Sequence, residues 1–329
     1  MSKMTIREIA AMAGVSAMTV SNVIRGRKDR VSEKTRKRIL DLIKEYDYVL
    51  NQNAANLKST TSSLIGVLLY NKRQFLDFTD PFVSSILTGV SNRIKEQGYF
   101  LMIDIVKSSA DIQILQRKWK FSGFVIIGVE AHDFLEIDAS IDVPATYVDT
   151  YYGEMVNPVS KLRSFIYTDE EEISRGAATY LSQRGHQKVL CYSFDFDESE
   201  TSVMSKRVQY FQQYFKGEVL LKTSSSSDYQ EILESVEEYL TFQPFTAIYA
   251  TADILAVKLN QIFKDISLLG VDNAPFSEFM SPKLTTMAID QVEKGEVALD
   301  CLIQMIKERK SKNAFLPSRL IIRDSVKKL

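Results

Sequence analysis

The sequence predicts a small all-α domain of the helix-turn-helix type, followed by a larger α/β domain with two lobes. Three observations predict this class. Residues 5–24 have the pattern of two short helices joined by a tight glycine turn. From residue 64 onward, apolar strand-like runs alternate with amphipathic helices, and this rhythm fails between Asp149 and Ser164 before it restarts. Residues 1–60 carry a net charge of +6, whereas the remainder carries −7.

Length and composition allow more than one domain. The 329 residues are 45% hydrophobic, which is enough for a sizeable core. Cys191 and Cys301 lie in apolar contexts, so we expect buried thiols, no disulfide, no metal and no cofactor. No secretory signal or membrane-spanning apolar run is visible, which predicts a cytoplasmic protein. No heptad extension follows Leu329, so a tetramer held by an added coil is not expected.

The first helix is predicted by its two ends. Thr5 and Glu8 form a capping-box pattern, so a helix should begin at about Ile6. Gly14 can adopt the left-handed conformation that ends a helix, and Ser16 can cap the next one. So short a turn makes the two helices cross steeply, as in proteins that place a second helix in the DNA major groove.

The second helix has an inner and an outer face. Val20, Val23 and Ile24 are expected to point inward. The outer face is then available to base edges, and its candidate residues are Ala17, Met18, Ser21 and Asn22. On spacing alone, an ordinary helical hairpin inside a larger domain fits equally well.

A third helix and the charge distribution favour DNA binding. This helix should start at Val31-Ser32 and run to about Tyr46. Its expected inner residues are Ile39, Leu42, Ile43 and Tyr46. Three short helices can thus share one core, and attraction to phosphate is confined to this end of the chain.

The rest of the chain has the pattern of helix-covered parallel sheets. Strands are expected near 64–69, 99–106, 124–128, 145–148, 188–192, 219–222, 247–250 and 267–271. Helices are expected near 81–97, 111–119, 171–184, 203–216, 229–240, 254–263 and 291–310. The last helix is expected to cross back to the first lobe.

The first fifty residues carry a specific set of motifs: Thr5-Ile6, Ala13-Gly14-Val15-Ser16, Thr19-Val20-Ser21, Gly26, Val31-Ser32, Thr35-Arg36, Arg38-Ile39, Tyr48 and Asn51. At this spacing they resemble the lactose-repressor (LacI/GalR) family of bacterial transcription regulators. The resemblance implies a sequence-specific regulator, most often a repressor, and adds Thr5, Ser16 and Thr19 to the DNA-contacting residues.

Residues 51–57 resemble the hinge helix of that family. The resemblance implies that Asn51, Ala54, Leu57 and Lys58 also contact DNA, with Leu57 wedged into the minor groove. By composition alone, residues 50–63 read as a polar linker. Leu50 replaces the proline usual before the hinge. Asn22 replaces the arginine common at the end of the recognition helix, which alters the expected base preference.

Further matches extend to the C-terminus: Asp80-Pro81-Phe82, Val143-Pro144, Asp149, Gly185-His186, Arg207, Asp253, Gly270-Val271-Asp272 and Pro282 to Thr286. They resemble the periplasmic-binding-protein-like effector domain of the family. The implied domains are residues 1–49 (DNA binding), 50–63 (hinge and linker) and 64–329 (effector binding and dimerisation). The implied first lobe spans about 64–166 plus 293–319, and the second about 167–290 plus 320–329.

The resemblance also implies an effector site in the cleft between the lobes, with Tyr70, Phe82, Asp149, Arg207, Asp253 and Asp272 as its residues. Asp149 and Asp272 each close an apolar strand, where ligands of open parallel sheets bind. Such carboxylates can accept sugar hydroxyls, although a strand-terminal aspartate is also commonly a helix cap or surface acid. Tyr210 and Ala252 replace the family's glycine and asparagine, which indicates an altered or narrowed site. His132 is expected in a loop.

Three functions compete. The first is a repressor that binds a near-palindromic operator as a dimer, through contacts on the 82–97 helix, and responds to a sugar-like effector. The second keeps the DNA-binding role but assigns control to a partner protein, with a non-functional cleft. The third is an enzyme on a doubly wound fold. The sequence lacks the Gly-x-Gly-x-x-Gly, Walker, Gly-x-Ser-x-Gly and His-Glu-x-x-His motifs, so enzymatic activity is not expected.

Overall fold

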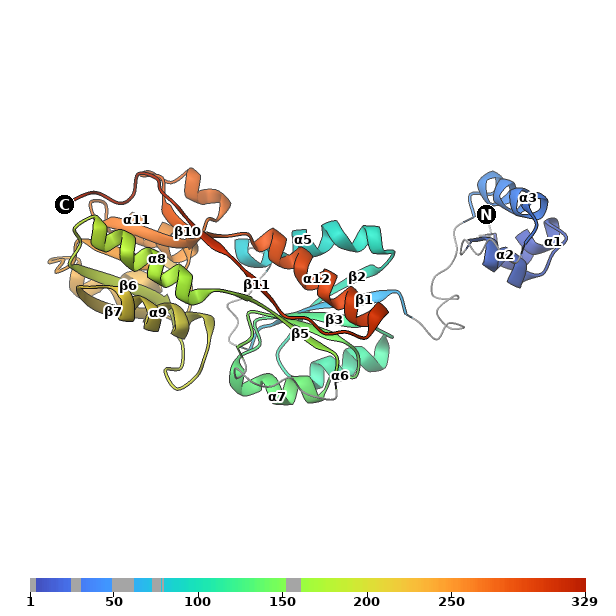
Figure 1. Cartoon of the computed structure of the whole chain (residues 1–329), viewed down its shortest axis with the longest axis horizontal. Coiled ribbons are helices and arrows are strands. Elements are labelled where there is room, and N and C mark those ends of the chain that lie inside the picture. The colour runs from blue at the N-terminus through green and yellow to red at the C-terminus, as the bar shows by residue number, and fades with distance from the viewer. Residues whose placement is uncertain (1–3, 25–30, 49–61, 73–77, 79, 152–160) are drawn as a thin grey trace. The chain divides into compact units, whose positions relative to one another are not determined.

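A computed structural model of the chain describes residues 4–24, 31–48, 62–72, 78, 80–151 and 161–329. They form two compact units, residues 1–62 and 63–329, which we describe separately (Figure 1). The predicted hinge residues Asn51, Ala54, Leu57 and Lys58, like Leu50, lie outside the described residues. Within the described part of the chain, no helix combines the length and apolarity required to cross a membrane.

The described residues of the first unit form three short helices: α1 (Ile6–Met12), α2 (Ala17–Ile24) and α3 (Glu33–Glu45). Their shared core confirms the predicted three-helix arrangement and consists of Ile9, Ala10, Ala13, Val20, Val23 and Ile39. Tyr46 was expected inside but is 39% exposed, because α3 ends at Glu45. Tyr48, two residues further on, packs against the core instead.

The second unit contains two sheets. The first lobe has strands β1 (Leu64–Tyr70), β2 (Phe100–Val106), β3 (Gly123–Ile127), β4 (Ala145–Val148), β5 (Arg163–Thr168) and β11 (Ala314–Leu316). Their order is β11-β5-β4-β3-β1-β2, with every pairing parallel. Its helices are α5 (Pro81–Gln97), α6 (Ser109–Lys118), α7 (Ala131–Ala139) and α12 (Gln291–Glu308). Helices α5 and α12 cover one face, and α6 and α7 the other (Figure 1).

The second lobe repeats this plan. Its strands are β6 (Lys188–Phe194), β7 (Glu218–Ser224), β8 (Ala247–Ala250), β9 (Ser267–Asp272), β10 (Thr285–Ile289) and β12 (Ser318–Ile321). Their order is β12-β10-β9-β8-β6-β7, and only β12 is antiparallel to its neighbour. Helices α8 (Glu170–Gln183) and α9 (Val203–Tyr214) pack on one face, and α10 (Tyr229–Ser235) and α11 (Asp253–Ile262) on the other.

The chain passes between the two lobes at three places. Strand β5 leads directly into α8, β10 into α12, and β11 into β12. The connecting residues are Asp169, Asp290 and Pro317. The two lobes are thus joined by three short connections.

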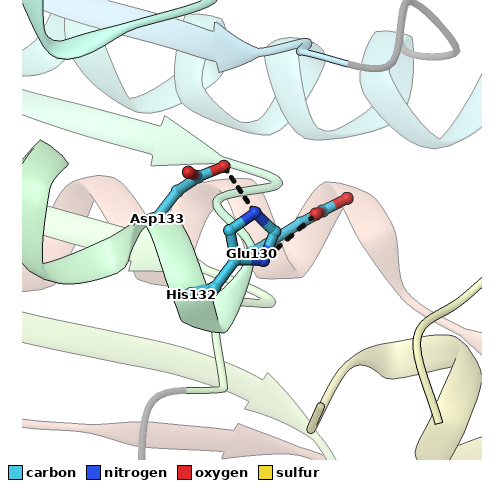
Figure 2. A group of neighbouring side chains, drawn as sticks. All are labelled: Glu130, His132 and Asp133. Atoms are coloured by element: carbon cyan, nitrogen blue, oxygen red, sulfur yellow. Dashed lines mark ion pairs between the residues drawn. The ribbon is translucent and has the colours of Figure 1, made fainter. Parts of the chain in front are cut away.

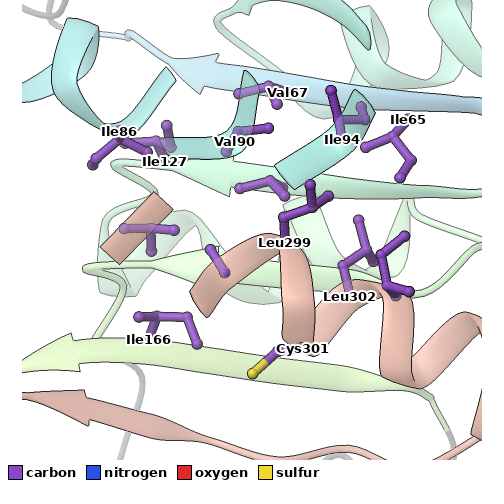
Figure 3. Packing of buried hydrophobic residues seen from close by; sticks show 14 of the residues in the cluster. Ile65, Val67, Ile86, Val90, Ile94, Ile127, Ile166, Leu299, Cys301 and Leu302 are labelled. Atoms are coloured by element: carbon purple, nitrogen blue, oxygen red, sulfur yellow. The ribbon is translucent and has the colours of Figure 1, made fainter. Parts of the chain in front are cut away.

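Helices α5 and α12 pack with their backbones in contact. A Cβ atom added at Gly89 would lie 2.0 Å from the carbonyl oxygen of Val292, and one added at Gly295 would lie 2.2 Å from that of Ile86. Figure 3 shows the apolar side chains that these helices bury above β1 and β3, including Val90 and Leu299. Glycine on both helices therefore sets their separation.

Most of the predicted elements are confirmed, including α5 with both of its ends. Gly98 follows it with φ +72°, as expected for a left-handed helix end. Helix α7 and strands β5, β10, β11 and β12 were not predicted from the sequence. These strands have three to six residues, and such short runs carry little periodic signal.

Candidate DNA-binding face and interlobe cleft

The two N-terminal helices begin as their sequences predict. Thr5 and Glu8 form the capping box of α1, with the Thr5 amide 2.7 Å from Glu8 Oε2. Gly14 has φ +62°, and Ser16 Oγ accepts the Thr19 amide proton at 3.1 Å. These bonds define where each helix begins, and they leave the Thr5 and Ser16 side chains exposed at the helix N-termini.

The exposed face of α2 is smaller than predicted. Met18 is 70% exposed, while Ala17, Thr19 and Ser21 are half-buried. Asn22 was expected to face outward but is only 8% exposed, so that orientation was wrong. The periodicity of α2 alone cannot reveal this, because burial also depends on how all three helices pack. Among these predicted residues of α2, Met18 is therefore the one with an exposed side chain.

A cavity of about 770 Å³ lies between the two lobes of the second unit. Four of the six residues predicted for effector binding line it: Phe82, Asp149, Arg207 and Asp272. Asp149 directly follows β4 and has φ +55°, and Asp272 is the last residue of β9 and has φ +112°. Non-glycine residues rarely adopt such values, which concentrate at functional sites.

Two predicted effector residues do not line the cavity. The Asp253 carboxylate is fully buried and accepts hydrogen bonds from the Ala274 amide at 2.9 Å, Ser277 Oγ at 2.6 Å and Thr286 Oγ1 at 2.8 Å. It therefore braces the loop after β9. Tyr70 is buried on the opposite side of its sheet from α5 and donates its hydroxyl proton to Asp133 at 2.7 Å. Their predicted contact with the effector was wrong for these reasons.

Tyr210 and Ala252, the two residues that replace the family's glycine and asparagine, differ in their position relative to the cavity. Ala252 lines the cavity, so the missing asparagine amide removes a polar group from it. Tyr210 is absent from the lining, and its ring lies 5.7 Å from Lys206 Nζ. The expectation that Tyr210 narrows the cleft was therefore wrong, because its side chain packs with a neighbour on α9.

Buried ion pairs hold the polar groups around the cleft. Lys294 Nζ, fully buried on α12, lies 2.8 Å from Asp149 Oδ2. Arg207 Nε donates to Glu170 Oε2 at 2.6 Å, and its Nη1 donates to the Thr251 carbonyl oxygen at 2.6 Å. Sequence reasoning missed Lys294 and Glu170, because partners distant in the chain leave no local pattern.

His132 belongs to a cluster at the start of α7, so its predicted loop position was wrong. Figure 2 shows Glu130, His132 and Asp133 with their side chains turned toward one another. Their possible ligand atoms lie within 4.8 Å, but Asp133 is already paired with Lys72 at 2.8 Å. The His132 imidazole Nδ1 lies 2.7 Å from Glu200 Oε2. Since α7 belongs to the first lobe and Glu200 to the second, this contact bridges the lobes.

The His132 bridge predicts a pH dependence of stability. The Glu200 hydrogen bond raises the pKa of His132, so the folded protein binds the proton more tightly than the unfolded chain does. This stabilisation is fully present below the unfolded pKa and is lost as pH rises through the folded one. Replacing His132 by glutamine should lower Tm by about 1–2 °C at pH 6, consistent with an exposed pair. At pH 8.5 the difference should vanish, and a pH-independent difference would contradict this origin.

These two units define a class of protein: a helix-turn-helix DNA-binding domain joined to a two-lobed domain with an interlobe cavity. Residues 5–51 match the family described as "Bacterial regulatory proteins, lacI family". Residues 178–326 match the "Periplasmic binding protein-like domain". The chain therefore combines a helix-turn-helix domain of the lacI type with a periplasmic-binding-protein-like domain.

Curated relatives agree over almost the whole chain. The HTH-type transcriptional repressor PurR of Vibrio vulnificus is 29% identical over 351 residues, covering 99% of each protein. Its counterpart in Photobacterium profundum is 28% identical, again covering 99% of each. Both relatives are named as transcriptional repressors, and their similarity extends over nearly the full length of this chain.

Solved structures share the fold. The Lac repressor dimer bound to operator and the anti-inducer ONPF has a TM-score of 0.82 and 22% identity, and covers 99% of this chain and 100% of that one. A LacI family regulator from Enterococcus faecium, solved with bound ribose, has a TM-score of 0.67 and 21% identity, covering 81% and 99%. These likenesses confirm the predicted fold.

Proposed function

We propose that this protein is a repressor that binds a near-palindromic operator as a dimer, and that a small molecule in the interlobe cavity controls its affinity. The cavity carries this proposal, because both lobes line it and three short connections join them. A ligand that prefers one separation of the lobes shifts the population toward that state. The Lac repressor solved with operator and the Enterococcus faecium regulator solved with ribose support DNA binding by the first unit and ligand binding by the second.

The proposed dimer contact involves α5 and the neighbouring edge strand β2. The exposed side of α5 is polar and includes Ser84, Thr88 and Asn92. Among the described strands, β2 pairs only with β1, and it exposes the apolar side chains Phe100, Ile103 and Ile105. An exposed sheet edge with apolar side chains is suited to burial against a second subunit. A two-fold dimer would match an operator with two symmetric half-sites.

Variants of α2 test the DNA-binding part of this proposal. Met18→Ala and Ser21→Ala should each weaken specific operator binding by about 10- to 100-fold, the value of one lost base contact. Binding to unrelated duplex should change little, because phosphate contacts remain. Fluorescence anisotropy with operator and scrambled duplex at fixed salt would measure both affinities.

The matched control is Asn22→Ala, since this neighbouring side chain is buried. It should lower the stability of the first unit while leaving the ratio of specific to nonspecific binding closer to the starting value. Unchanged operator affinity in both Met18→Ala and Ser21→Ala would refute the proposed docking. Leu57→Ala tests the hinge contact separately and should also abolish specific binding.

A second candidate is control by a partner protein, with a cleft that binds nothing. The observation that favours it is the pairing of Asp149 with Lys294 and of Arg207 with Glu170, which occupies polar groups expected for a ligand. A thermal-shift screen would separate the two candidates, since a cavity ligand raises Tm in a concentration-dependent manner. If no small molecule alters Tm or operator affinity while a protein partner does, the second candidate holds.

A further inference from the structure

The lining of the interlobe cavity is predominantly acidic. Among the lining residues that the structure describes, nine carry carboxyl groups and two carry guanidinium groups. The acids come from both lobes, with Glu130 and Asp149 in the first and Asp195 and Asp272 in the second. A low-dielectric cleft lined mainly by one sign of charge concentrates ligands of the opposite sign.

The two buried cations at the cleft are each paired with a protein carboxylate. Lys294 Nζ lies 3.0 and 2.8 Å from the two oxygens of Asp149. Arg207 uses Nε for Glu170 and Nη1 for a backbone carbonyl, and lies 3.9 Å from Asp272. The second guanidinium of the lining, Arg319, is exposed. An anionic ligand would have to compete with Asp149 and Glu170 for these cations.

Asp272, at the end of β9, is the second-lobe acid placed to face a cation in the cavity. The first residue of α12, Gln291, donates from its Nε2 to Asp272 Oδ1 at 3.4 Å and helps to position this carboxylate. Burial raises the pKa of Asp272 to about 8, which a nearby positive charge would reverse.

Aromatic rings complete the environment. Phe82, Phe194, Phe196 and Phe276 line the cavity. The Phe82 ring already faces one ammonium group, with Lys294 Nζ 5.9 Å from its centroid. Ring faces attract cations, so these walls suit an organic cation better than an anion.

We infer that the effector is an organic cation, whose protonated amine pairs with Asp272 while its carbon skeleton contacts the phenylalanine rings. This inference rests on the proposed function, in which the cavity binds a small molecule. It replaces the neutral sugar expected from the sequence by an amine-bearing compound, such as a polyamine or an amino sugar.

Matched ligand sets test the charge directly on the full-length protein. Putrescine, 1,4-butanediol and succinate share a four-carbon skeleton, and glucosamine and glucose share a sugar ring. Thermal shift and calorimetry should detect binding of a cationic member, with at least tenfold weaker binding of its neutral or anionic counterpart. Binding of putrescine, whose amines stay protonated in this range, should strengthen between pH 6.5 and 8.5, because the ammonium group requires the ionised form of Asp272.

Two substitutions of the same type locate the binding site. Asp272→Asn retains the size of the side chain, and asparagine tolerates the backbone of this position. It should weaken cation binding at least tenfold. Asp265→Asn removes the same charge from a residue outside the lining that is 98% exposed, and should leave binding unchanged.

The outcomes separate this inference from the proposed function. If a neutral or anionic member binds instead, with an effect on operator affinity, the cleft is functional and the cationic ligand class is wrong. Equal loss of binding in both aspartate variants would also overturn the assignment, since it would indicate nonspecific attraction. If no member of any charge binds and operator affinity never responds, both the inference and small-molecule control fail.

Discussion

Replacing Arg207 by alanine is expected to lower the free energy of unfolding of the two-lobed domain by about 3–5 kcal/mol. Arg207 is 4% exposed, and its guanidinium donates to Glu170, which is 3% exposed. Without it, Glu170 stays buried as a charge without its partner, or binds a proton at a cost. The Thr251 carbonyl oxygen also loses a donor. Urea unfolding followed by circular dichroism would measure the change.

Two further variants identify the cause. Arg207→Met with Glu170→Gln removes both charges but keeps the volume, so the double variant should be more stable than Arg207→Ala. Lys216→Ala removes a positive charge from an exposed residue just after α9 and should change stability by less than about 0.5 kcal/mol. If Arg207→Ala unfolded at the same urea concentration as the wild type, the stabilising role of the Arg207–Glu170 pair would be contradicted. Loss of ligand binding in that variant is therefore interpretable only if its fold is intact.

Local signals explain why so much of the fold is predictable. A capping box at Thr5 and glycines at 14 and 98 fix helix ends within a few residues of chain. Buried parallel strands such as β1 read as continuous apolar runs. By contrast, β11 has three residues, and its position depends on pairing with β5, about 150 residues earlier.

The candidate site was only partly predictable, because residue type does not reveal a residue's partner. Asp253 and Asp272 are both aspartates near strand ends. The Asp253 carboxylate accepts hydrogen bonds from Ala274, Ser277 and Thr286. The Asp272 side chain lines the cavity. Lys294 reads as an exposed helix residue, yet it is fully buried because Asp149, 145 residues away in the chain, neutralises it. Only the folded structure brings these groups together.

The second large effect is expected at the contact between α5 and α12. Glycine to alanine within a helix normally stabilises by about 0.5–1 kcal/mol, through helix propensity. At Gly295, however, the new methyl group would lie 2.2 Å from the Ile86 carbonyl oxygen, a backbone atom that cannot rotate away. The helices must separate, which opens the apolar packing around Val90 and Leu299 (Figure 3). We expect Gly295→Ala to destabilise the two-lobed domain by about 3 kcal/mol, as severe overpacking does.

The sign of the change makes this prediction sharp. Gly89→Ala should act in the same direction, since its methyl group would meet the Val292 carbonyl oxygen at 2.0 Å. Lys95→Ala, on the exposed side of α5, is the matched control and should stay within about 0.5 kcal/mol of the wild type. Urea denaturation of the three variants gives the comparison. A gain in stability for Gly295→Ala would show that α5 and α12 can separate at little cost in free energy. The close backbone contact would then not determine how these two helices pack in the first lobe. If the contact does fix it, α12 transmits movement at the Asp290 crossing to α5 as a rigid unit, and with it to the proposed dimer surface.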